Sequence, residues 1–280
     1  MGRVTVRKPV LRVNGATQTD RLDSLVVEEP LEIRLGGESL ALTMRTPGED
    51  VDLVHGFLHA EGVARVREDV SAVRYCAGVD PTTGLQTYNV VDVALSAEAQ
   101  DRAKGLKRAF AVSSACGVCG KASLDQVVTA GAYRLADDTS RFSSSVLAEA
   151  PDALRSAQRV FQATGGLHAA AIMEPDGNVL AVREDVGRHN AVDKVIGHFL
   201  RQGGLPLAGH ALVVSGRASF ELVQKAVLAG IPLLAAVSAP SSLAVDLAAS
   251  AGLTLVGFLR GETMNVYTCQ DRVAAPAQIS

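Results

Sequence analysis

The chain has 280 residues, of which 48% are hydrophobic and 20% charged, a composition typical of a globular protein with a large core. Its 27 basic and 30 acidic side chains nearly cancel, which argues against bulk affinity for nucleic acid or for an acidic membrane surface. Four cysteines are too few for a disulfide framework, and the N-terminus has no apolar signal core, so we expect a cytoplasmic protein.

The first part of the chain, residues 1–110, is predicted to be a strand-rich domain with one helix. Residues 1 to 25 resemble a loosely held arm with a turn at Asn14-Gly15. Alternating apolar residues on both sides of Gly36-Gly37 predict a β-hairpin over residues 28–44. The run Thr46-Pro47-Gly48-Glu49 has the pattern of a capping box and predicts a helix that stops near Gly62. Two further strands follow over 70–77 and 87–95.

The rest of the chain alternates between helix and strand patterns. Helices are predicted over 122–133, 151–163, 189–201, 219–229 and 241–251, and strands over 167–173, 179–183, 210–214, 231–237 and 253–259. This alternation predicts an α/β layered domain with a partly parallel sheet over residues 111–270, and a loose tail over 271–280. The fold class is therefore α/β, or α+β for the whole chain.

One uncharged segment, residues 226–245, is in principle long enough to span a bilayer. Gly230, Pro232 and Pro240 interrupt it, together with three serines between 238 and 242. We therefore expect a helix, a buried strand, a turn and the start of another helix here, and no membrane span.

Two of the cysteines, Cys116 and Cys119, form a CxxC loop in which a glycine follows each sulfur-bearing residue. Lys121 and the start of the helix predicted over 122–133 would both lower the pKa of a nearby thiol, because each stabilises the thiolate. Such a loop is typical of a metal site, a dithiol redox site or a persulfide carrier.

For a zinc site, His59-Ala60-Glu61 offers the H-x-E half of the nucleobase-deaminase signature. The other half requires a proline where Ala115 stands, and His59 lies far upstream of Cys116. We interpret His59 as a helix-end residue and predict no metal site. The dithiol alternative lacks the strand pattern of thioredoxin-like motifs, but the residues alone do not decide between it and the persulfide carrier.

Three predicted strand-to-helix turns, at residues 184–190, 215–219 and 238–242, share hydroxyls, small residues and free backbone N–H groups, and two of them add an arginine. Ligands of α/β sheets gather at such turns, where helix N-termini favour anions. Helix capping by Asn190, Ser219 or Ser241 would explain any one turn, whereas all three together favour an anionic ligand. His168 could be structural or functional. The predicted contacts are Arg188, His189, Ser215, Gly216, Arg217, Ser238 and Ser241.

Several long motifs occur in the order found in one known family. They include Glu28-Glu29-Pro30-Leu31, Met44-Arg45-Thr46-Pro47-Gly48, Cys116-Gly117-Val118-Cys119-Gly120 after Ser113-Ser114, Thr164-Gly165-Gly166-Leu167-His168, and the runs 183–194, 214–221, 238–242 and 265–268. On these motifs the chain resembles the FdhD/NarQ family of formate dehydrogenase accessory sulfurtransferases. It departs from the family at Ala115, where other members often place the cysteine directly after the serines; we expect this to change loop packing only.

The resemblance implies a sulfur carrier. Cys116 would accept persulfide sulfur from a cysteine desulfurase, with Cys119 assisting it or partly redundant with it. It would deliver the sulfur to a molybdenum (or tungsten) bis(molybdopterin guanine dinucleotide) cofactor before that cofactor enters the formate dehydrogenase apoenzyme. A cytidine-deaminase-like domain and a homodimer are implied as well. The implied cofactor contacts are Phe258, Leu259, Arg260, Gly261, Glu262 and Thr263. The alternative is a non-catalytic chaperone that binds the cofactor and moves no sulfur.

Overall fold

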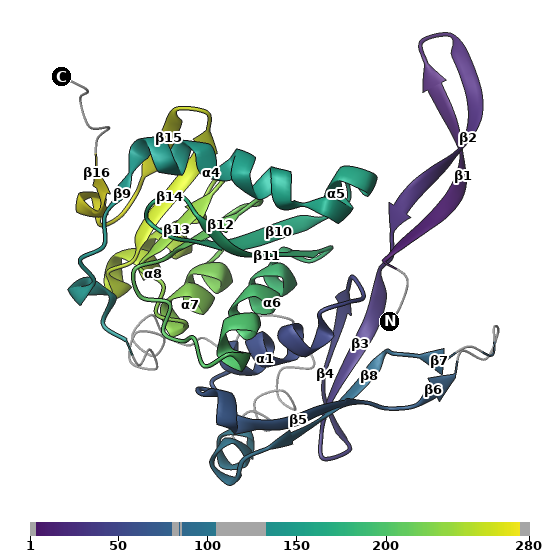
Figure 1. Cartoon of the computed structure of the whole chain (residues 1–280), viewed down its shortest axis with the longest axis horizontal. Coiled ribbons are helices and arrows are strands. Elements are labelled where there is room, and N and C mark those ends of the chain that lie inside the picture. Colours follow the sequence, from purple (N-terminus) through teal and green to yellow (C-terminus); the bar gives the residue numbers. More distant parts are fainter. Residues whose placement is uncertain (1–3, 80–83, 85, 105–132, 275–280) are drawn as a thin grey trace.

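The computed structural model describes residues 4–79, 84, 86–104 and 133–274, and two β-sheets joined by a pair of packed helices organise them (Figure 1). The CxxC loop and the helix predicted over 122–133, apart from its last residue, lie outside the described residues. Within these residues, no helix is long and apolar enough to cross a membrane.

The larger sheet has six strands in the order β11-β10-β12-β13-β14-β15. Strands β12, β13 and β14 are parallel, while β10 runs antiparallel to both β11 and β12, and β15 antiparallel to β14. The predicted partly parallel sheet is thus confirmed. Its strands are β10 (His168–Met173), β11 (Val179–Asp185), β12 (Ala211–Val214), β13 (Leu233–Ala236), β14 (Thr254–Arg260) and β15 (Thr263–Val266).

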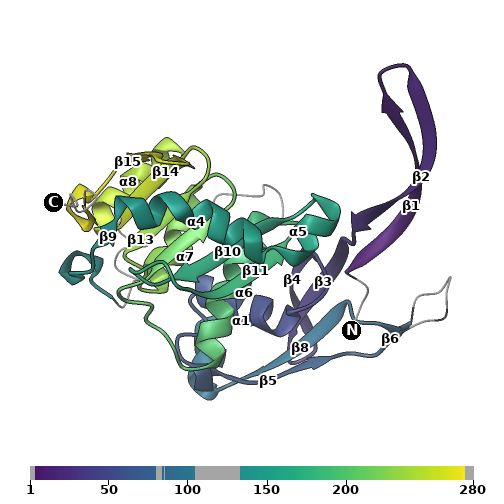
Figure 2. The same cartoon turned by 45° about the horizontal axis from the view of Figure 1, so that its top comes forward.

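Helices cover both faces of this sheet, because neighbouring strand residues point to opposite sides. Ile172, Leu212 and Leu234 pack against α6 (Arg188–Arg201), α7 (Phe220–Leu228) and α8 (Ser242–Ala251). Met173 and Val213 face the other way, onto α4 (Ser144–Ala157), which lies across the sheet in Figure 2. The uncharged segment 226–245 is therefore the end of α7, the buried strand β13 and the start of α8, as predicted.

The smaller sheet has the order β4-β3-β8-β5 and packs against α1 (Asp50–Ala60). The hairpin predicted across Gly36-Gly37 is confirmed, since β3 and β4 pair in antiparallel register on either side of those glycines. A further helical segment, residues 97–104, lies beyond the single helix predicted for this part of the chain. The strands are β3 (Glu29–Leu35), β4 (Glu38–Arg45), β5 (Val70–Tyr75) and β8 (Val90–Leu95), with a short pair β6 (Gly78–Val79) and β7 (Gln86–Thr87) beside them.

The capping box predicted at the start of α1 is wrong. Glu49 is the N-cap residue, with a left-handed backbone (φ 55°), and its side chain makes no capping hydrogen bond. Thr46 is buried and its Oγ1 accepts a hydrogen bond from the backbone N–H of Val186, 140 positions later in the chain. The Thr46 hydroxyl therefore makes a tertiary contact instead of the helix-capping contact that the local pattern predicted.

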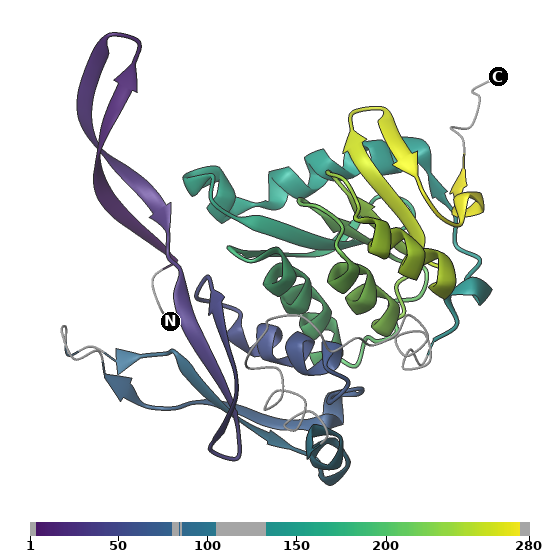
Figure 3. The ribbon, with the colours of Figure 1, turned by 180° about the vertical axis from the view of Figure 1, so that it is seen from behind.

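Three other expectations also change. The predicted loose arm is a regular hairpin, β1 (Thr5–Asn14) and β2 (Thr17–Val26), which projects from the body of the molecule (Figures 1 and 3). The helix predicted from Pro151 begins at Ser144, with Ser143 as its cap, and is followed by a separate helix, α5 (Arg159–Thr164). Within the predicted tail, Arg272 is buried and β16 (Val273–Ala274) pairs with β9 (Phe142–Ser143).

The two sheets meet through the crossing of α1 and α6, where each helix contributes a glycine. A Cβ atom added to Gly197 would lie 1.9 Å from the backbone oxygen of Asp52, and one added to Gly56 would lie 1.9 Å from that of Asp193. The helices therefore touch backbone to backbone, an approach that only glycine allows. This crossing holds α6, whose first turn faces the candidate site, against the N-terminal part of the chain.

Candidate functional site

The predicted turns all lie at one edge of the larger sheet. Strands β11, β12, β13 and β14 run in the same direction, because β10 is antiparallel to both β11 and β12 while β12, β13 and β14 are parallel. Their carboxyl ends therefore share an edge, where α6, α7 and α8 begin, and His168 at the start of β10 lies at the same edge. This is the position at which open α/β sheets bind ligands.

Backbone hydrogen bonds connect neighbouring turns into a continuous row. The N–H of Ser238 donates to the oxygen of Gly216 (3.4 Å), and that of Ser241 donates to the oxygen of Ala218 (3.0 Å). The N–H of Phe258 in turn donates to the oxygen of Ser238 (3.2 Å). The structure thus brings together most of the predicted site residues, from Arg188 to Phe258, along one sheet edge.

Helix capping explains only one of the three turns. Ser241 is a true cap, because its Oγ accepts a hydrogen bond from the N–H of Ala244. Ser219 occupies the N-cap position of α7 without a capping hydrogen bond from its side chain. Asn190 lies inside α6, and its amide donates to the oxygens of Met44 and Asp185. In the other two turns, the polar side chains of Ser219 and Asn190 therefore make contacts other than helix capping.

The hydroxyl of Ser219 contacts His189 instead. The Nε2 atom of His189 lies 3.1 Å from Ser219 Oγ and 3.5 Å from a carboxylate oxygen of Glu221. Burial lowers the pKa of His189, and the nearby charges of Arg188 and Lys225 lower it further, while Glu221 raises it. Together these effects favour the neutral form of the imidazole.

Basic side chains lie at the same sheet edge as this imidazole. Arg188 has no ion pair or hydrogen bond within the described part of the chain, and its Nε atom is buried without a partner. His168 and Arg188 flank Gly216, where an added Cβ would be 3.4 Å from His168 Nδ1 and 3.7 Å from Arg188 Cδ. Burial and the Arg188 charge lower the pKa of His168. Arg217 is exposed on the next turn. A buried guanidinium nitrogen without an acceptor fits an anion at this edge.

The last residues of β14 include one with an unusual backbone conformation. Phe258 has a positive φ of 53° and its side chain is 42% exposed, an unfavourable combination for a bulky residue. Leu259 is fully buried in the core on the α4 side of the sheet, so only its backbone can face a ligand. Arg260, Gly261, Glu262 and Thr263 are exposed where β14 turns into β15.

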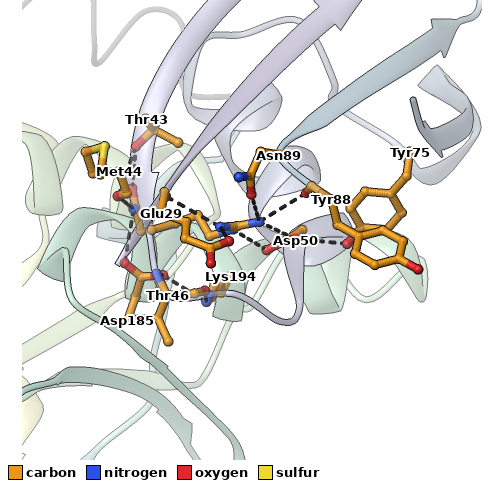
Figure 4. A network of polar contacts seen from close by, with 12 residues as sticks. Glu29, Thr43, Met44, Thr46, Asp50, Tyr75, Tyr88, Asn89, Asp185 and Lys194 are labelled. Atoms are coloured by element: carbon orange, nitrogen blue, oxygen red, sulfur yellow. Dashed lines mark hydrogen bonds and ion pairs between the residues drawn. The ribbon is translucent and has the colours of Figure 1, made fainter. Parts of the chain in front are cut away.

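A buried polar network holds the turn that carries Arg188 (Figure 4). Lys194 Nζ lies 2.8 Å from Asp185 Oδ2 and donates to the backbone oxygen of Thr46, and Asp185 also accepts from the N–H groups of Thr46 and Gly187. Arg45, beside Thr46, is buried against Asp50. Such fully hydrogen-bonded buried charges fix local geometry, so the N-terminal sheet sets the position of the first turn of α6.

The sulfur residues need separate mention. Cys116 and Cys119 lie outside the described residues, so their predicted roles stay predictions. Cys76 and Cys269 are free and partly buried. His59 lies in the last turn of α1, where its Nδ1 bonds the backbone oxygen of Ala64, the helix-end position predicted for it. No cluster of potential metal ligands occurs among the residues that the structure places.

Sequence reasoning missed Glu221 and gave no role to the buried pair that supports it. Lys225 Nζ is 2.7 Å from Asp193 Oδ1 and 3.4 Å from Glu221 Oε1, and Lys225 and Asp193 are both buried. The i, i+4 spacing of Glu221 and Lys225 was visible in the sequence. Their contacts with His189 and Asp193 were not, because these require α6 and α7 to lie side by side.

Comparison with known proteins gives a consistent result. The FdhD/NarQ family model matches residues 26–274. A Nocardia farcinica protein named sulfur carrier protein FdhD is 58% identical over 272 residues, covering 97% of this chain and 96% of its own, and a Streptomyces coelicolor protein of the same name is 56% identical over 280 residues, covering 100% and 99%. The crystal structure of a formate dehydrogenase accessory protein from Desulfotalea psychrophila has the same fold, with a TM-score of 0.75, 20% identity, and coverage of 97% and 100%.

Proposed function

Because the chain belongs to the FdhD/NarQ family, we propose that it is a sulfurtransferase that serves formate dehydrogenase. Cys116 accepts sulfane sulfur from a cysteine desulfurase, with Cys119 assisting. The loaded protein passes the sulfur to a bis(molybdopterin guanine dinucleotide) cofactor before that cofactor enters the apoenzyme. The relatives' shared name supports the carrier role, and the CxxC loop with Lys121 supplies thiols whose ionisation is favoured.

The observation that carries the cofactor part of the proposal is the buried Nε of Arg188 at the carboxyl edge of the sheet, which has no hydrogen-bond partner among the described residues. Each guanine dinucleotide contains a pyrophosphate, and helix N-termini together with arginine are the receptor that phosphate prefers. Arg188 and Arg217 would hold phosphates, while Ser215, Ser238 and the exposed residues of 258–263 lie along the same edge to contact the rest of the ligand.

Other expectations from the family belong to the same proposal. We place the protein in the cytoplasm as a homodimer, with a desulfurase as sulfur donor and the formate dehydrogenase apoenzyme as final recipient of the cofactor. We also propose that the larger sheet and its helices form the cytidine-deaminase-like layer, with domains at 1–110 and 111–270. The cofactor is a bound acceptor, and no permanently held metal is proposed.

Sulfur loading tests the proposal against the chaperone alternative. The purified protein is incubated with a cysteine desulfurase and cysteine, and its intact mass is then measured with and without a thiol reductant. A sulfur carrier gains the mass of at least one sulfur atom, and the reductant removes it, because a persulfide is reducible. An unchanged mass under conditions in which the desulfurase turns over would favour the chaperone that moves no sulfur.

Phosphate recognition is tested with GDP as a surrogate ligand. Arg217→Ala is expected to raise the Kd for GDP by about tenfold to a hundredfold, because one charge-assisted hydrogen bond contributes about 1.5–3 kcal/mol. Isothermal titration calorimetry measures the change. Arg12→Ala, which removes an exposed arginine from the β1–β2 hairpin, is the matched control. Equal affinities in the wild type and Arg217→Ala would remove Arg217 from the site.

A further inference from the structure

His189 is approached by two polar groups at the same ring nitrogen. Ser219 Oγ lies 3.1 Å and Glu221 Oε2 3.5 Å from Nε2, and the structure gives Nδ1 no hydrogen bond within the described residues. This differs from a nucleophile triad, in which the carboxylate and the hydroxyl hold opposite ring nitrogens. Ser219 is therefore not placed as an activated nucleophile, and the arrangement needs another explanation.

The carboxylate of Glu221 has a second partner besides His189. Its other oxygen, Oε1, lies 3.4 Å from Lys225 Nζ, and Lys225 is bound to Asp193 at 2.7 and 2.9 Å. Lys225 and Asp193 are 4% and 3% exposed. The chain of contacts runs from the helix core through Lys225 and Glu221, whose side chain is 52% exposed, to the imidazole at the sheet edge. Each carboxylate oxygen of Glu221 therefore has one ionisable partner.

We propose that Glu221 is a positioning residue that keeps the proton of His189 on Nε2 and leaves Nδ1 as a hydrogen-bond acceptor for the bound ligand. The physical reason is that an ionised carboxylate only accepts hydrogen bonds. With Nε2 protonated, Ser219 Oγ also accepts from the ring. The hydroxyl proton of Ser219 and the lone pair on Nδ1 then both remain for the ligand.

This assignment gives the arginines and His189 different parts of the ligand to bind. The identity of that ligand rests on the proposed function. Phosphate oxygens accept hydrogen bonds, so they match Arg188 and Arg217 but not a bare Nδ1. A ribose hydroxyl or a base N–H donates, so it matches Nδ1. His189 therefore binds the nucleoside portion of a guanine dinucleotide, while the arginines bind its phosphates.

The charges around His189 make the proposal measurable. Burial lowers the pKa of His189 most, and Glu221 raises it. Arg188 on its own helix, Lys225 on α7 and His168 on β10 lower it further. Removing the negative charge should therefore move the titration of His189 to lower pH. Glu98→Gln, an exposed position in the segment 97–104, is a matched control that should leave the titration unchanged.

The first test uses the free protein and needs neither ligand nor sulfur. Nuclear magnetic resonance of isotope-labelled histidine reports which ring nitrogen of His189 carries the proton and at which pH the ring titrates. In the wild type, at pH values above the titration midpoint of His189, we expect the single ring proton on Nε2. In Glu221→Gln we expect the titration midpoint to fall, and in Glu221→Ala a larger share of the Nδ1-protonated form. The proposal would be overturned if the ring proton of the wild type were on Nδ1, or if neither substitution changed the titration midpoint or the tautomer of His189.

The second test asks what His189 recognises. Glu221→Gln and His189→Ala should each weaken the binding of GDP several-fold and leave the affinity for inorganic pyrophosphate unchanged. The double variant should lose no further affinity for GDP, because one residue acts through the other. Equal losses for GDP and pyrophosphate, or fully additive effects, would refute the division of roles. If the wild type binds neither compound, the proposed function fails, while the first test still decides the role of Glu221.

Discussion

Replacing Cys116 by alanine is expected to reduce formate dehydrogenase activity to the level of a strain that lacks this protein. The reason is chemical: alanine cannot form a persulfide, so no sulfur reaches the cofactor. The measurement is formate oxidation in extracts of a deletion strain that expresses either the wild type or the variant. The intact mass of the variant should also stay unchanged after incubation with the desulfurase and cysteine.

Controls for this experiment come from the other cysteines. Cys76→Ala and Cys269→Ala remove partly buried free thiols and should retain both the sulfur load and the activity. Cys119→Ala should retain part of both if that residue only assists. Full formate dehydrogenase activity with Cys116→Ala would contradict the carrier role, provided that the variant accumulates to the wild-type level.

The substitution Gly197→Ala is expected to destabilise the folded protein by about 3 kcal/mol or more, the upper end of the usual cost of overpacking. The added Cβ would lie 1.9 Å from the backbone oxygen of Asp52. No rotamer change relieves a contact between Cβ and backbone, so α1 and α6 must separate. The partner position behaves in the same way, since Gly56 faces the backbone of Asp193 at the same distance.

The sign of this effect is itself informative. Alanine is the better helix former by about 1 kcal/mol, so helix propensity alone would make Gly197→Ala more stable than the wild type. Urea unfolding followed by circular dichroism gives the free energy of unfolding. Gly204→Ala, where the new Cβ comes no closer than 3.4 Å to any neighbour, should change it little. A stabilised Gly197→Ala would show that the helices do not cross as closely as described.

Helix separation should also reach the candidate site. Arg188 and His189 occupy the first turn of α6, and Gly187, Asn190 and Lys194 bind Asp185 at the end of β11. A shift of α6 away from α1 strains these contacts. We therefore expect any folded Gly56 or Gly197 variant to bind GDP more weakly than the wild type.

Local patterns predicted those parts of the fold whose structure depends on local chemistry. The hairpin across Gly36-Gly37 and the helix–strand alternation after β10 follow from apolar periodicity and turn residues, and both are confirmed. The capping box failed because Thr46 is bound by a residue 140 positions away. The helix predicted to begin at Pro151 starts at Ser144 instead, and Pro151 lies in the interior of α4.

The sequence indicated where the candidate site lies on the sheet, but not which side chains contact one another there. Strand ends followed by helices that start with serine or arginine mark the ligand edge of an α/β sheet, which located Arg188, Ser215 and Ser241. The partners of each side chain depend on which helices are neighbours. Nothing in the local sequence of Ser219 distinguishes a helix cap from a contact with His189, and only the packing of α6 against α7 does so.

The transfer of labelled sulfur tests the central claim most directly. The protein is loaded with radiolabelled sulfur from cysteine by the desulfurase, separated from that enzyme, and mixed with isolated molybdenum bis(molybdopterin guanine dinucleotide) cofactor. We predict that the label leaves the wild-type protein and appears in the cofactor fraction, and that Cys116→Ala delivers none. Label that stays on the protein while the cofactor binds, or that never attaches to it, would contradict a sulfur carrier.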